Sequence, residues 1–141
     1  MDRAKKHELP IVTDPGFGRI EIFSGCSVIK PNQKEWAEYV GKKESEKIAI
    51  VDLFSQGTGN ILITQGSLGL RLITPTLDVQ VRSQDSIQVV DVTGAGDSLA
   101  AGVALVLGRG FELVSQLDRL NLIGARTVSS RKTELPDVDV I

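Results

Sequence analysis

Short apolar runs that end at turn residues alternate along this chain with longer stretches in which apolar positions recur at helical spacing. Leu9 to Thr13 ends at Asp14-Pro15-Gly16, and Ser27 to Ile29 ends at Lys30-Pro31-Asn32. Runs of this length that are closed by Pro, Gly or Asn are typical of strands followed by turns. The sequence therefore predicts two short strands in the first 30 residues.

Two helices are predicted next. The first runs from Asn32 to about Val40, because Trp36 and Val40 fall at helical spacing, and Gly41 suits its C-terminal cap. The second runs from Glu44 to about Ser55. The residues of this second helix that we expect to face inward are Ile48, Val51, Leu53 and Phe54.

The centre of the chain is predicted to form strands. Ile61-Leu62-Ile63 is an unbroken apolar run, which indicates a strand that is covered on both faces, as in a parallel sheet. Thr64 to Gly69 is predicted to be a turn. Further strands are predicted at Leu70 to Thr74, near Val79 to Val81 and at Ile87 to Val90.

From Gly94 onward the apolar spacing becomes helical. One helix is predicted from about Gly94 to Gly108, with Leu99, Val103 and Val106 on one face. The second is marked by Leu113, Leu117, Leu120, Gly124 and Val128. Strands that alternate with helices predict an α/β protein with layers around a mainly parallel sheet, in which ligands bind beyond the carboxyl ends of the strands.

Composition and charge exclude several classes of protein. The 141 residues suffice for one domain, and a net charge of −2 gives no attraction for nucleic acid or an anionic membrane surface. No stretch approaches the roughly 20 apolar residues of a membrane span, and the charged N-terminus lacks the apolar run of a signal peptide. Cys26, the single cysteine, cannot form an internal disulfide. We expect a cytoplasmic protein.

The loop from Asp91 to Ser98 carries the strongest chemical signal, because it lies between a predicted strand and a predicted long helix. Small residues at Gly94-Ala95-Gly96 leave backbone N–H groups accessible at the positive end of the helix, which favours an anion. Asp97 adds a carboxylate in the first turn. Phosphoryl transfer to an alcohol needs both groups. The N–H donors stabilise the phosphoryl group that is transferred, and the carboxylate acts as the base that takes the hydroxyl proton.

A purely structural interpretation of this loop stays open. An aspartate in the first turn of a helix is favoured by the helix dipole, and Gly94-Ala95-Gly96 could simply allow close packing. The loop is not a Walker A motif, because no Gly-Lys-Ser/Thr follows. Gly94 and Gly96 also lack the third glycine of a dinucleotide-binding fingerprint, which argues against a dinucleotide-dependent oxidoreductase.

Four motifs in the same order resemble the pfkB/ribokinase family of carbohydrate kinases. Asp91-Val92-Thr93-Gly94-Ala95-Gly96-Asp97-Ser98 is similar to its Asp-x-Thr-Gly-Ala-Gly-Asp signature, and Lys30-Pro31-Asn32-Gln33-Lys34-Glu35 to its Pro-Asn-x-x-Glu element. Leu62 to Gly69 resembles its Thr-x-Gly-x-x-Gly nucleotide loop with the preceding strand, and Asp14-Pro15 its Asp-Pro element. The resemblance implies a ribokinase-like, three-layer (αβα) Rossmann-like fold, of which residues 1–141 form the C-terminal, nucleotide-binding half.

The same resemblance implies roles for individual residues. Asp97 would be the catalytic base, and Gly94, Ala95 and Gly96 the anion hole. Thr64, Gly66 and Gly69 would line the ATP site, and Asn121 would lie near the nucleotide base. Asn32 and Glu35 would organise Mg²⁺ through water, and Asp91 and Thr93 would hold a monovalent cation, K⁺ in potassium-activated members. On the residues alone, Asn32 and Glu35 form a capping box, and Thr64 to Gly69 could be an ordinary hairpin turn.

The resemblance covers the second half of a family member, so the sugar-binding strands and lid would lie elsewhere. Ser129-Ser130-Arg131-Lys132-Thr133 lacks the glycine usual in the loop that completes the cation and adenine sites. The signature loop resembles most the heptose 7-phosphate kinase branch, whereas Lys30-Pro31-Asn32 resembles sugar-phosphate kinases of the phosphofructokinase type. A half-fold exposes a sheet edge, so we expect a homo-oligomer or association with the complementary half-domain.

Two functions therefore follow from the sequence. The first is ATP-dependent phosphorylation of a sugar or sugar-phosphate hydroxyl. The second is a non-catalytic nucleotide-binding or interaction module, which the incomplete fold makes plausible. Both predict ATP binding, so only phosphoryl transfer or ATP hydrolysis separates them.

Overall fold

The structure is a computed structural model that describes residues 1–16, 18–83 and 94–129. The strands are β1 (Val12–Thr13), β2 (Val28–Ile29), β3 (Asn60–Thr64), β4 (Leu70–Ile73) and β5 (Asp78–Val81). The helices are α1 (Asp2–Lys6), α2 (Gln33–Gly41), α3 (Glu46–Ser55), α4 (Ala95–Gly108) and α5 (Leu113–Ser129), with 3-10 helices η1 (Ile20–Phe23) and η2 (Gly66–Leu68). Nearly all of these elements lie where the sequence predicted them, but α1 and η1 fall in stretches for which no element was predicted.

The chain divides into two compact units. The first consists of Met1–Gln65 and Arg71–Val79, and the second of Gly66–Leu70 together with the described residues from Gln80 onward. No helix in the described ranges has the length and apolar character that a membrane crossing requires.

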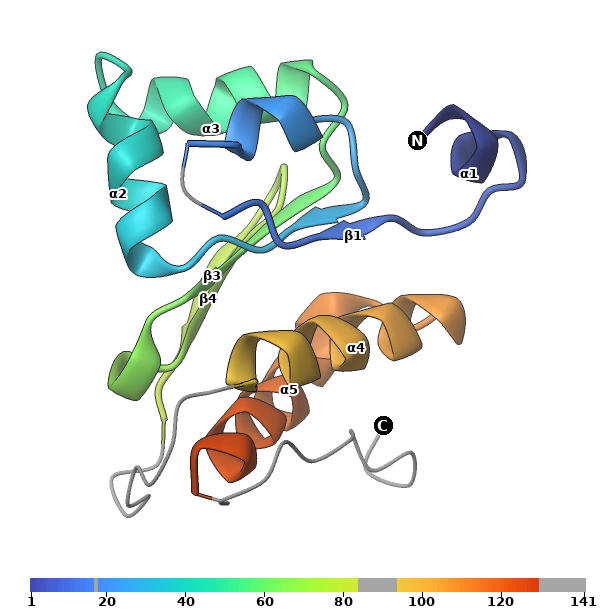
Figure 1. The fold of residues 1–141 in the computed structure, drawn as a ribbon, viewed down its shortest axis with the longest axis vertical. Coiled ribbons are helices and arrows are strands. Elements are labelled where there is room, and N and C mark those ends of the chain that lie inside the picture. The colour runs from blue at the N-terminus through green and yellow to red at the C-terminus, as the bar shows by residue number, and fades with distance from the viewer. Residues whose placement is uncertain (17, 84–93, 130–141) are drawn as a thin grey trace. The chain divides into compact units, whose positions relative to one another are not determined.

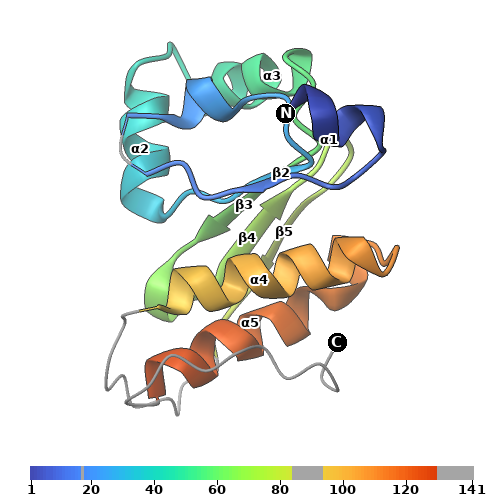
Figure 2. The same cartoon turned by 45° about the vertical axis from the view of Figure 1, so that its right-hand side comes forward.

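The sheet has the strand order β1-β2-β3-β4-β5 (Figures 1 and 2). β1, β2 and β3 are parallel, with Val12 opposite Val28 and Ile29 opposite Ile61, and α2 and α3 form the long crossover that connects β2 to β3. The connections on either side of β4 are too short for a crossover, so β4 pairs antiparallel with both neighbours. The sheet is therefore mixed, and the predicted parallel arrangement holds for its first three strands.

The core of the first unit forms where α2 and α3 pack on one face of the sheet. Ile61 and Ile63 of β3 share this core with Trp36 of α2 and Leu53 of α3. Leu62, which points to the opposite face, is also fully buried. The structure therefore confirms a strand that is covered on both faces, as its unbroken apolar run indicated.

The predicted inward face of α3 is wrong at two positions. Ile48 and Val51 are 43% and 57% exposed, whereas Ala49 and Leu53 are fully buried. All four residues from Ile48 to Val51 are apolar, so the sequence pattern does not distinguish the two sides of this helix. The packing of Ala49 and Leu53 in the core decides which side faces inward.

A polar network ties the helices of the first unit to β4 and β5. The Arg71 guanidinium donates to Glu46 Oε1 at 2.7 Å and to Asp78 Oδ2 at 2.7 Å, and Trp36 Nε1 donates to Glu46 Oε1 at 2.8 Å. Hydrogen bonds from Arg71, and then from Trp36, hold the pKa of Glu46 below its usual value. The hydrogen bonds from Arg71 likewise lower the pKa of Asp78.

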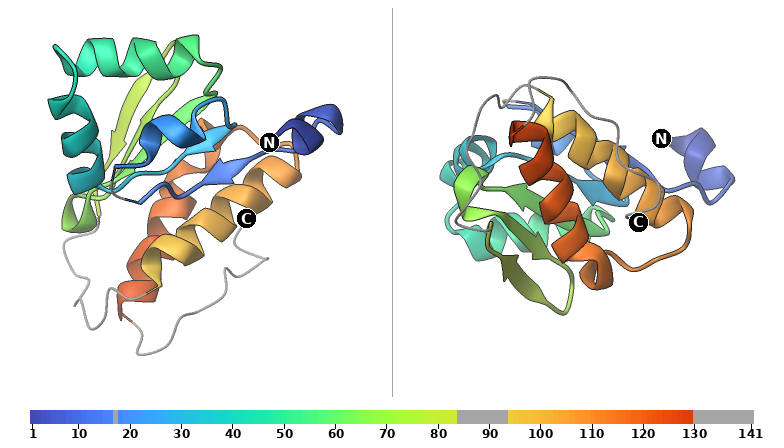
Figure 3. Two further views of the ribbon diagram at one scale, coloured as in Figure 1. Left: turned by 45° about the horizontal axis from the view of Figure 1, so that its top comes forward. Right: turned by 90° about the horizontal axis from the view of Figure 1, so that it is seen from below.

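The second unit contains α4 and α5, which lie side by side in both views of Figure 3. The short connection between them makes the pair antiparallel. Its buried apolar residues include Leu99, Val103, Val106, Leu113, Leu117 and Leu120. α4 begins next to Gly94, so the predicted position of this helix is confirmed.

Two glycines of the η2 loop differ in what surrounds them. Gly69 has φ +95°, and a Cβ there would collide with the carbonyl oxygen of Val81 and lie 2.8 Å from the amide nitrogen of Ser83. Gly66 has φ +58°, but a Cβ there would meet nothing within 4 Å. Both positions favour glycine for their backbone conformation, and only Gly69 is also required by a close approach of the backbone.

The Arg71 network should stabilise the fold in a pH-dependent way. Arg71→Met should lower the free energy of unfolding at pH 7 by roughly 1–2 kcal/mol, because two carboxylates lose their partner. The two pKa values are lowered on folding, so this contribution is complete above the ordinary values of 4.5 and 3.8. It should decrease as the pH falls below these ordinary values and the two carboxylates become protonated.

Urea unfolding of the Arg71 variant and the wild type across this pH range tests the prediction. Arg119→Met, which removes an exposed arginine of α5, should change stability by less than about 0.5 kcal/mol. If Arg71→Met lowers the free energy of unfolding by the same amount at every pH, the two carboxylates do not contribute to the stability of the fold.

The two glycines should respond differently to alanine. Gly69→Ala should lower the free energy of unfolding by about 2–4 kcal/mol, since backbone strain and a steric collision add. Gly66→Ala should cost only about 1–2 kcal/mol, the penalty for the left-handed conformation alone. Equal losses for the two variants in urea unfolding would contradict the close packing of Gly69.

Candidate functional site

The start of α2 is built from Asn32 and Glu35, two residues of the predicted site. Asn32 Oδ1 accepts hydrogen bonds from the backbone N–H groups of Lys34 at 2.9 Å and Glu35 at 3.0 Å. Glu35 Oε2 accepts one from the Asn32 N–H at 2.8 Å, which completes a capping box. These bonds satisfy donors that would otherwise lack partners at the helix terminus. Within the described chain, Glu35 Oε1 makes no hydrogen bond.

Thr64 lies directly beside this helix start. Asn32 and Thr64 form an isolated parallel bridge that extends the pairing of β2 with β3, and the Thr64 N–H donates to the Pro31 carbonyl at 3.0 Å. Both residues follow the carboxyl ends of parallel strands, where ligands of α/β proteins bind. The structure therefore brings Asn32, Glu35 and the start of the Thr64–Gly69 loop together at one edge of the sheet.

Lys30 adds a buried positive charge at the same edge. Its side chain is only 3% exposed, and its Nζ pairs with Asp14 Oδ2 at 2.6 Å. Its backbone N–H donates to the Thr13 carbonyl, so Lys30 and Asp14 follow the neighbouring strands β2 and β1. Sequence reasoning recognised both motifs but assigned neither side chain a role. A lysine directly after the apolar run Ser27–Ile29, where exposed charge is not expected, was the available signal.

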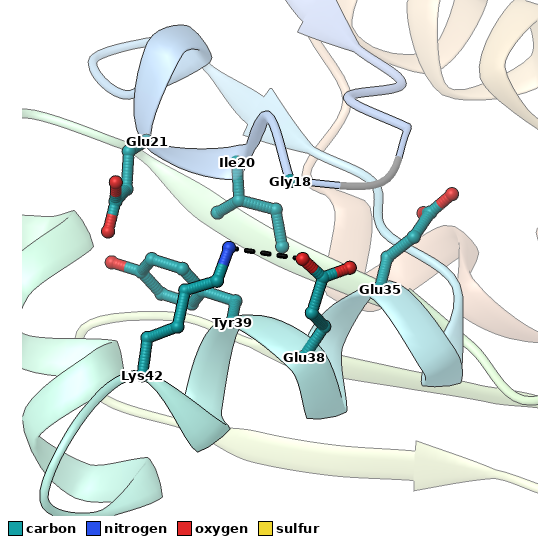
Figure 4. A pocket seen from close by; sticks show the side chains of 7 residues that line it. All are labelled: Gly18, Ile20, Glu21, Glu35, Glu38, Tyr39 and Lys42. Atoms are coloured by element: carbon teal, nitrogen blue, oxygen red, sulfur yellow. Dashed lines mark ion pairs between the residues drawn. The ribbon is translucent and has the colours of Figure 1, made fainter.

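A small pocket lies on the other side of Glu35, between α2 and the segment that contains η1 (Figure 4). Three carboxylates line it, those of Glu21, Glu35 and Glu38, and Lys42 Nζ pairs with Glu38 at 3.1 Å. The excess of negative charge disfavours a phosphate here. Among the described residues, no group of three or more His, Cys, Asp or Glu side chains is arranged to hold a metal ion.

Gly66, Gly69 and Asn121 belong to the second unit. Gly69 lies against the backbone of Val81 and Ser83, and Asn121 Nδ2 of α5 donates to the carbonyl of the intervening Arg82 at 3.0 Å. Gly69 and Asn121 thus both lie next to the short backbone segment that follows β5.

The N-terminus of α4 presents backbone donors and a carboxylate. Gly94 caps the helix in the left-handed conformation, with φ +81° and no side chain to satisfy the first N–H groups. The first hydrogen bond of the helix runs from the Ser98 N–H to the Gly94 carbonyl at 2.9 Å, so the preceding N–H groups have no partner within the helix. Asp97 is exposed in the first turn. Donors and carboxylate therefore occur together, as predicted.

Several predicted features lie outside the described residues. These are Asp91 and Thr93 of the cation site, the strand at Ile87 to Val90 and the loop that continues from Ser130 to Thr133. The monovalent-cation site therefore stays a prediction from the sequence.

Known proteins support the fold and the family. The model of the pfkB family carbohydrate kinases matches residues 13–139. The chain is 32% identical to the Bifunctional protein HldE of Caulobacter vibrioides over 96% of its own length, which is 29% of the length of that relative.

Two solved structures share the fold. Ribokinase of Arabidopsis thaliana, complexed with ribose and ATP, matches with a TM-score of 0.76 at 23% identity. The match covers 99% of this chain and 48% of the ribokinase chain. Phosphofructokinase-2 of Escherichia coli, in complex with potassium, matches with a TM-score of 0.74 at 17% identity. The match covers 99% of this chain and 47% of the phosphofructokinase-2 chain. They confirm the ribokinase-like α/β fold that the motifs implied, and with the family match they show that the chain belongs to the pfkB family of carbohydrate kinases.

Proposed function

We propose that this chain is the nucleotide-binding and catalytic half of an ATP-dependent kinase that phosphorylates a hydroxyl group of a sugar or sugar phosphate. The observation that carries the proposal is the N-terminus of α4. There the exposed carboxylate of Asp97 follows backbone N–H groups that have no partner within the helix. Membership of the pfkB family supports the same reaction class.

In the proposed reaction, Asp97 accepts the proton of the acceptor hydroxyl as its oxygen forms a bond to the γ-phosphorus of ATP. The bond from that phosphorus to the β,γ-bridging oxygen breaks, and ADP leaves. The N–H groups of Gly94, Ala95 and Gly96 donate to the transferring phosphoryl group, where the helix dipole favours negative charge. A carboxylate of ordinary basicity suffices, because the loose transition state needs the proton only late.

The remaining predicted residues would hold the nucleotide and its ions. Thr64, Gly66 and Gly69 would line the ATP site, with Asn121 near the base. Asn32 and Glu35 would organise Mg²⁺ through water, and Asp91 and Thr93 would hold K⁺. The ATP in the Arabidopsis ribokinase structure and the potassium in the phosphofructokinase-2 structure support these proposals for a related fold. Glu35 Oε1, which makes no hydrogen bond with the described residues, is compatible with a water-mediated role.

For the acceptor we propose a sugar phosphate. The likeness to a Bifunctional protein HldE supports a heptose phosphate, and Lys30-Pro31-Asn32 is the feature that instead favours a phosphofructokinase-type substrate. The chain spans 29% of the HldE relative and about half of the matching solved chains. We therefore propose that sugar binding requires the part of the fold that this chain does not include.

The alternative function is a nucleotide-binding module without catalysis. The partial coverage of its relatives is the observation that favours it. This module would bind ATP but would neither hydrolyse it nor phosphorylate a sugar, even in the presence of the remaining part of the fold.

Asp97→Asn tests the base assignment in a kinase that carries this chain together with the remainder of the fold. We expect kcat to fall by roughly 10²–10⁴, the usual contribution of a positioned base. ATP affinity should change little, because the amide keeps the shape of the side chain. The measurement is sugar phosphorylation at saturating ATP.

Glu112→Gln provides a matched control, because it removes an exposed carboxylate that follows the C-terminal end of α4, the end opposite to Asp97. It should leave kcat unchanged. Near-normal turnover in Asp97→Asn would remove the base assignment and favour the non-catalytic module.

The variant Glu35→Gln distinguishes the role of Glu35 in capping α2 from its proposed role at the Mg²⁺ site. Glutamine can still accept the Asn32 N–H, so the free energy of unfolding should change by less than about 0.5 kcal/mol, whereas Asn32→Ala should cost about 1 kcal/mol. If Glu35 orients the water around Mg²⁺, Glu35→Gln should nevertheless raise the Mg²⁺ concentration that half-maximal kinase activity requires.

The control is Glu38→Gln, which removes a carboxylate from the neighbouring pocket and should leave the Mg²⁺ requirement unchanged. Identical Mg²⁺ dependence in the wild type and Glu35→Gln would leave Glu35 as a helix cap only.

A further inference from the structure

The outward side of α3 carries apolar side chains that the described part of the chain leaves partly uncovered. Ile48 and Val51 are 43% and 57% exposed, and they lie one helical turn apart, so they form one apolar strip. Six of the ten residues of α3 are apolar, and the inward ones already belong to the core of the first unit. A helix with apolar residues on opposite sides normally has neighbours on both sides. The strip is therefore a candidate contact surface.

Charged residues of opposite sign flank this strip. Lys47 lies on one flank and is exposed, and it makes no ion pair or hydrogen bond with the described residues. Asp52 lies on the other flank, with 33% of its side chain exposed. Its carboxylate accepts three hydrogen bonds within the chain, so about one of the roughly four acceptor positions of a carboxylate is still available.

These four residues follow the pattern of a parallel two-stranded coiled coil. Ile48 and Val51 occupy the a and d positions of a heptad, with Lys47 at the preceding g position and Asp52 at the following e position. In a parallel pair, a and d residues pack between the helices, and a g residue of one helix faces the next e residue of the other. Lys47 of each copy then meets Asp52 of the other copy. An antiparallel pair brings each flank against the same flank of the other helix, and this charge pairing is lost.

We propose that the outward side of α3 is a self-association surface, through which two copies of this chain form a weak dimer by parallel pairing of their α3 helices. Glu21 and Asp52 both pair with Lys43, so the region around Asp52 carries one net negative charge. This charge attracts Lys47 of the second copy. One ten-residue helix from each copy buries less than the roughly 1,200 Å² of a stable interface, so we expect a Kd of about 10 μM to 1 mM.

Val51→Gln tests the apolar part of the surface. Analytical ultracentrifugation at about 10 μM to 1 mM should show an equilibrium of monomer and dimer for the wild type. Val51→Gln should raise the Kd at least about 10-fold, because its amide must be desolvated between the helices. The melting temperature of the monomer should not change, since residue 51 is exposed. Leu77→Gln makes a comparable change at an exposed position between β4 and β5 and should leave the Kd unchanged.

Lys47→Glu tests the orientation of the two helices. In the parallel pair it places two carboxylates together at each flank, so the Kd should rise about 5- to 50-fold. The control is Lys34→Glu, which reverses an exposed charge on α2 and should not change the Kd.

Val51→Cys gives a second measure of orientation that does not depend on weakening the dimer. In the parallel pair residue 51 faces its own counterpart, so oxidation should join the two copies by a disulfide. The wild type should not form this link, because Cys26 is buried.

The outcomes separate this surface from other modes of association. A wild-type chain that stays monomeric at about 1 mM would overturn the proposal. A dimer that Val51→Gln leaves unchanged would also overturn it and would place the contact elsewhere, for example at the sheet edge. A dimer that Val51→Gln weakens, but that neither responds to Lys47→Glu nor forms a disulfide in Val51→Cys, would overturn the parallel pairing.

Discussion

The parallel pairing of β2 with β3 is the constraint on which the candidate site of the first unit depends. It continues beyond the two strands into the bridge between Asn32 and Thr64, so the segments that follow them start side by side. α2 and α3 lie between these strands in the chain and return it to the same end of the sheet. Two motifs about 30 residues apart in sequence are therefore adjacent in space. The proposed Mg²⁺ and nucleotide roles both require this adjacency.

The same polar groups that start α2 could also serve a ligand. The capping box uses Asn32 Oδ1 and Glu35 Oε2, and it fixes both side chains at the strand edge. A fixed carboxylate with one oxygen still available is better prepared to orient water around a metal ion than a mobile one. The structural and functional interpretations of this pair are therefore compatible.

Charge divides the surroundings of α2 into two regions. Lys30 is buried at the edge of the sheet, where its Nζ pairs with Asp14. On the other side of Glu35, three carboxylates face a small pocket that contains a single lysine. A negatively charged substrate is repelled from the second region, whereas Lys30 and Asp14 neutralise each other at the first. This difference argues against the pocket as the place where phosphate groups bind.

By itself, the sequence determined the order and approximate bounds of the main elements, because turn residues and helical spacing are local signals. It also determined the capping box and the glycine-rich start of α4, which depend on residues no more than four positions apart. Tertiary structure alone decided which side of α3 is buried, since the run from Ile48 to Val51 is apolar on every side. It also decided that Lys30 is buried against Asp14. These properties depend on segments that meet only when the chain folds; the lysine after the apolar run Ser27–Ile29 could indicate burial, but not the partner that permits it.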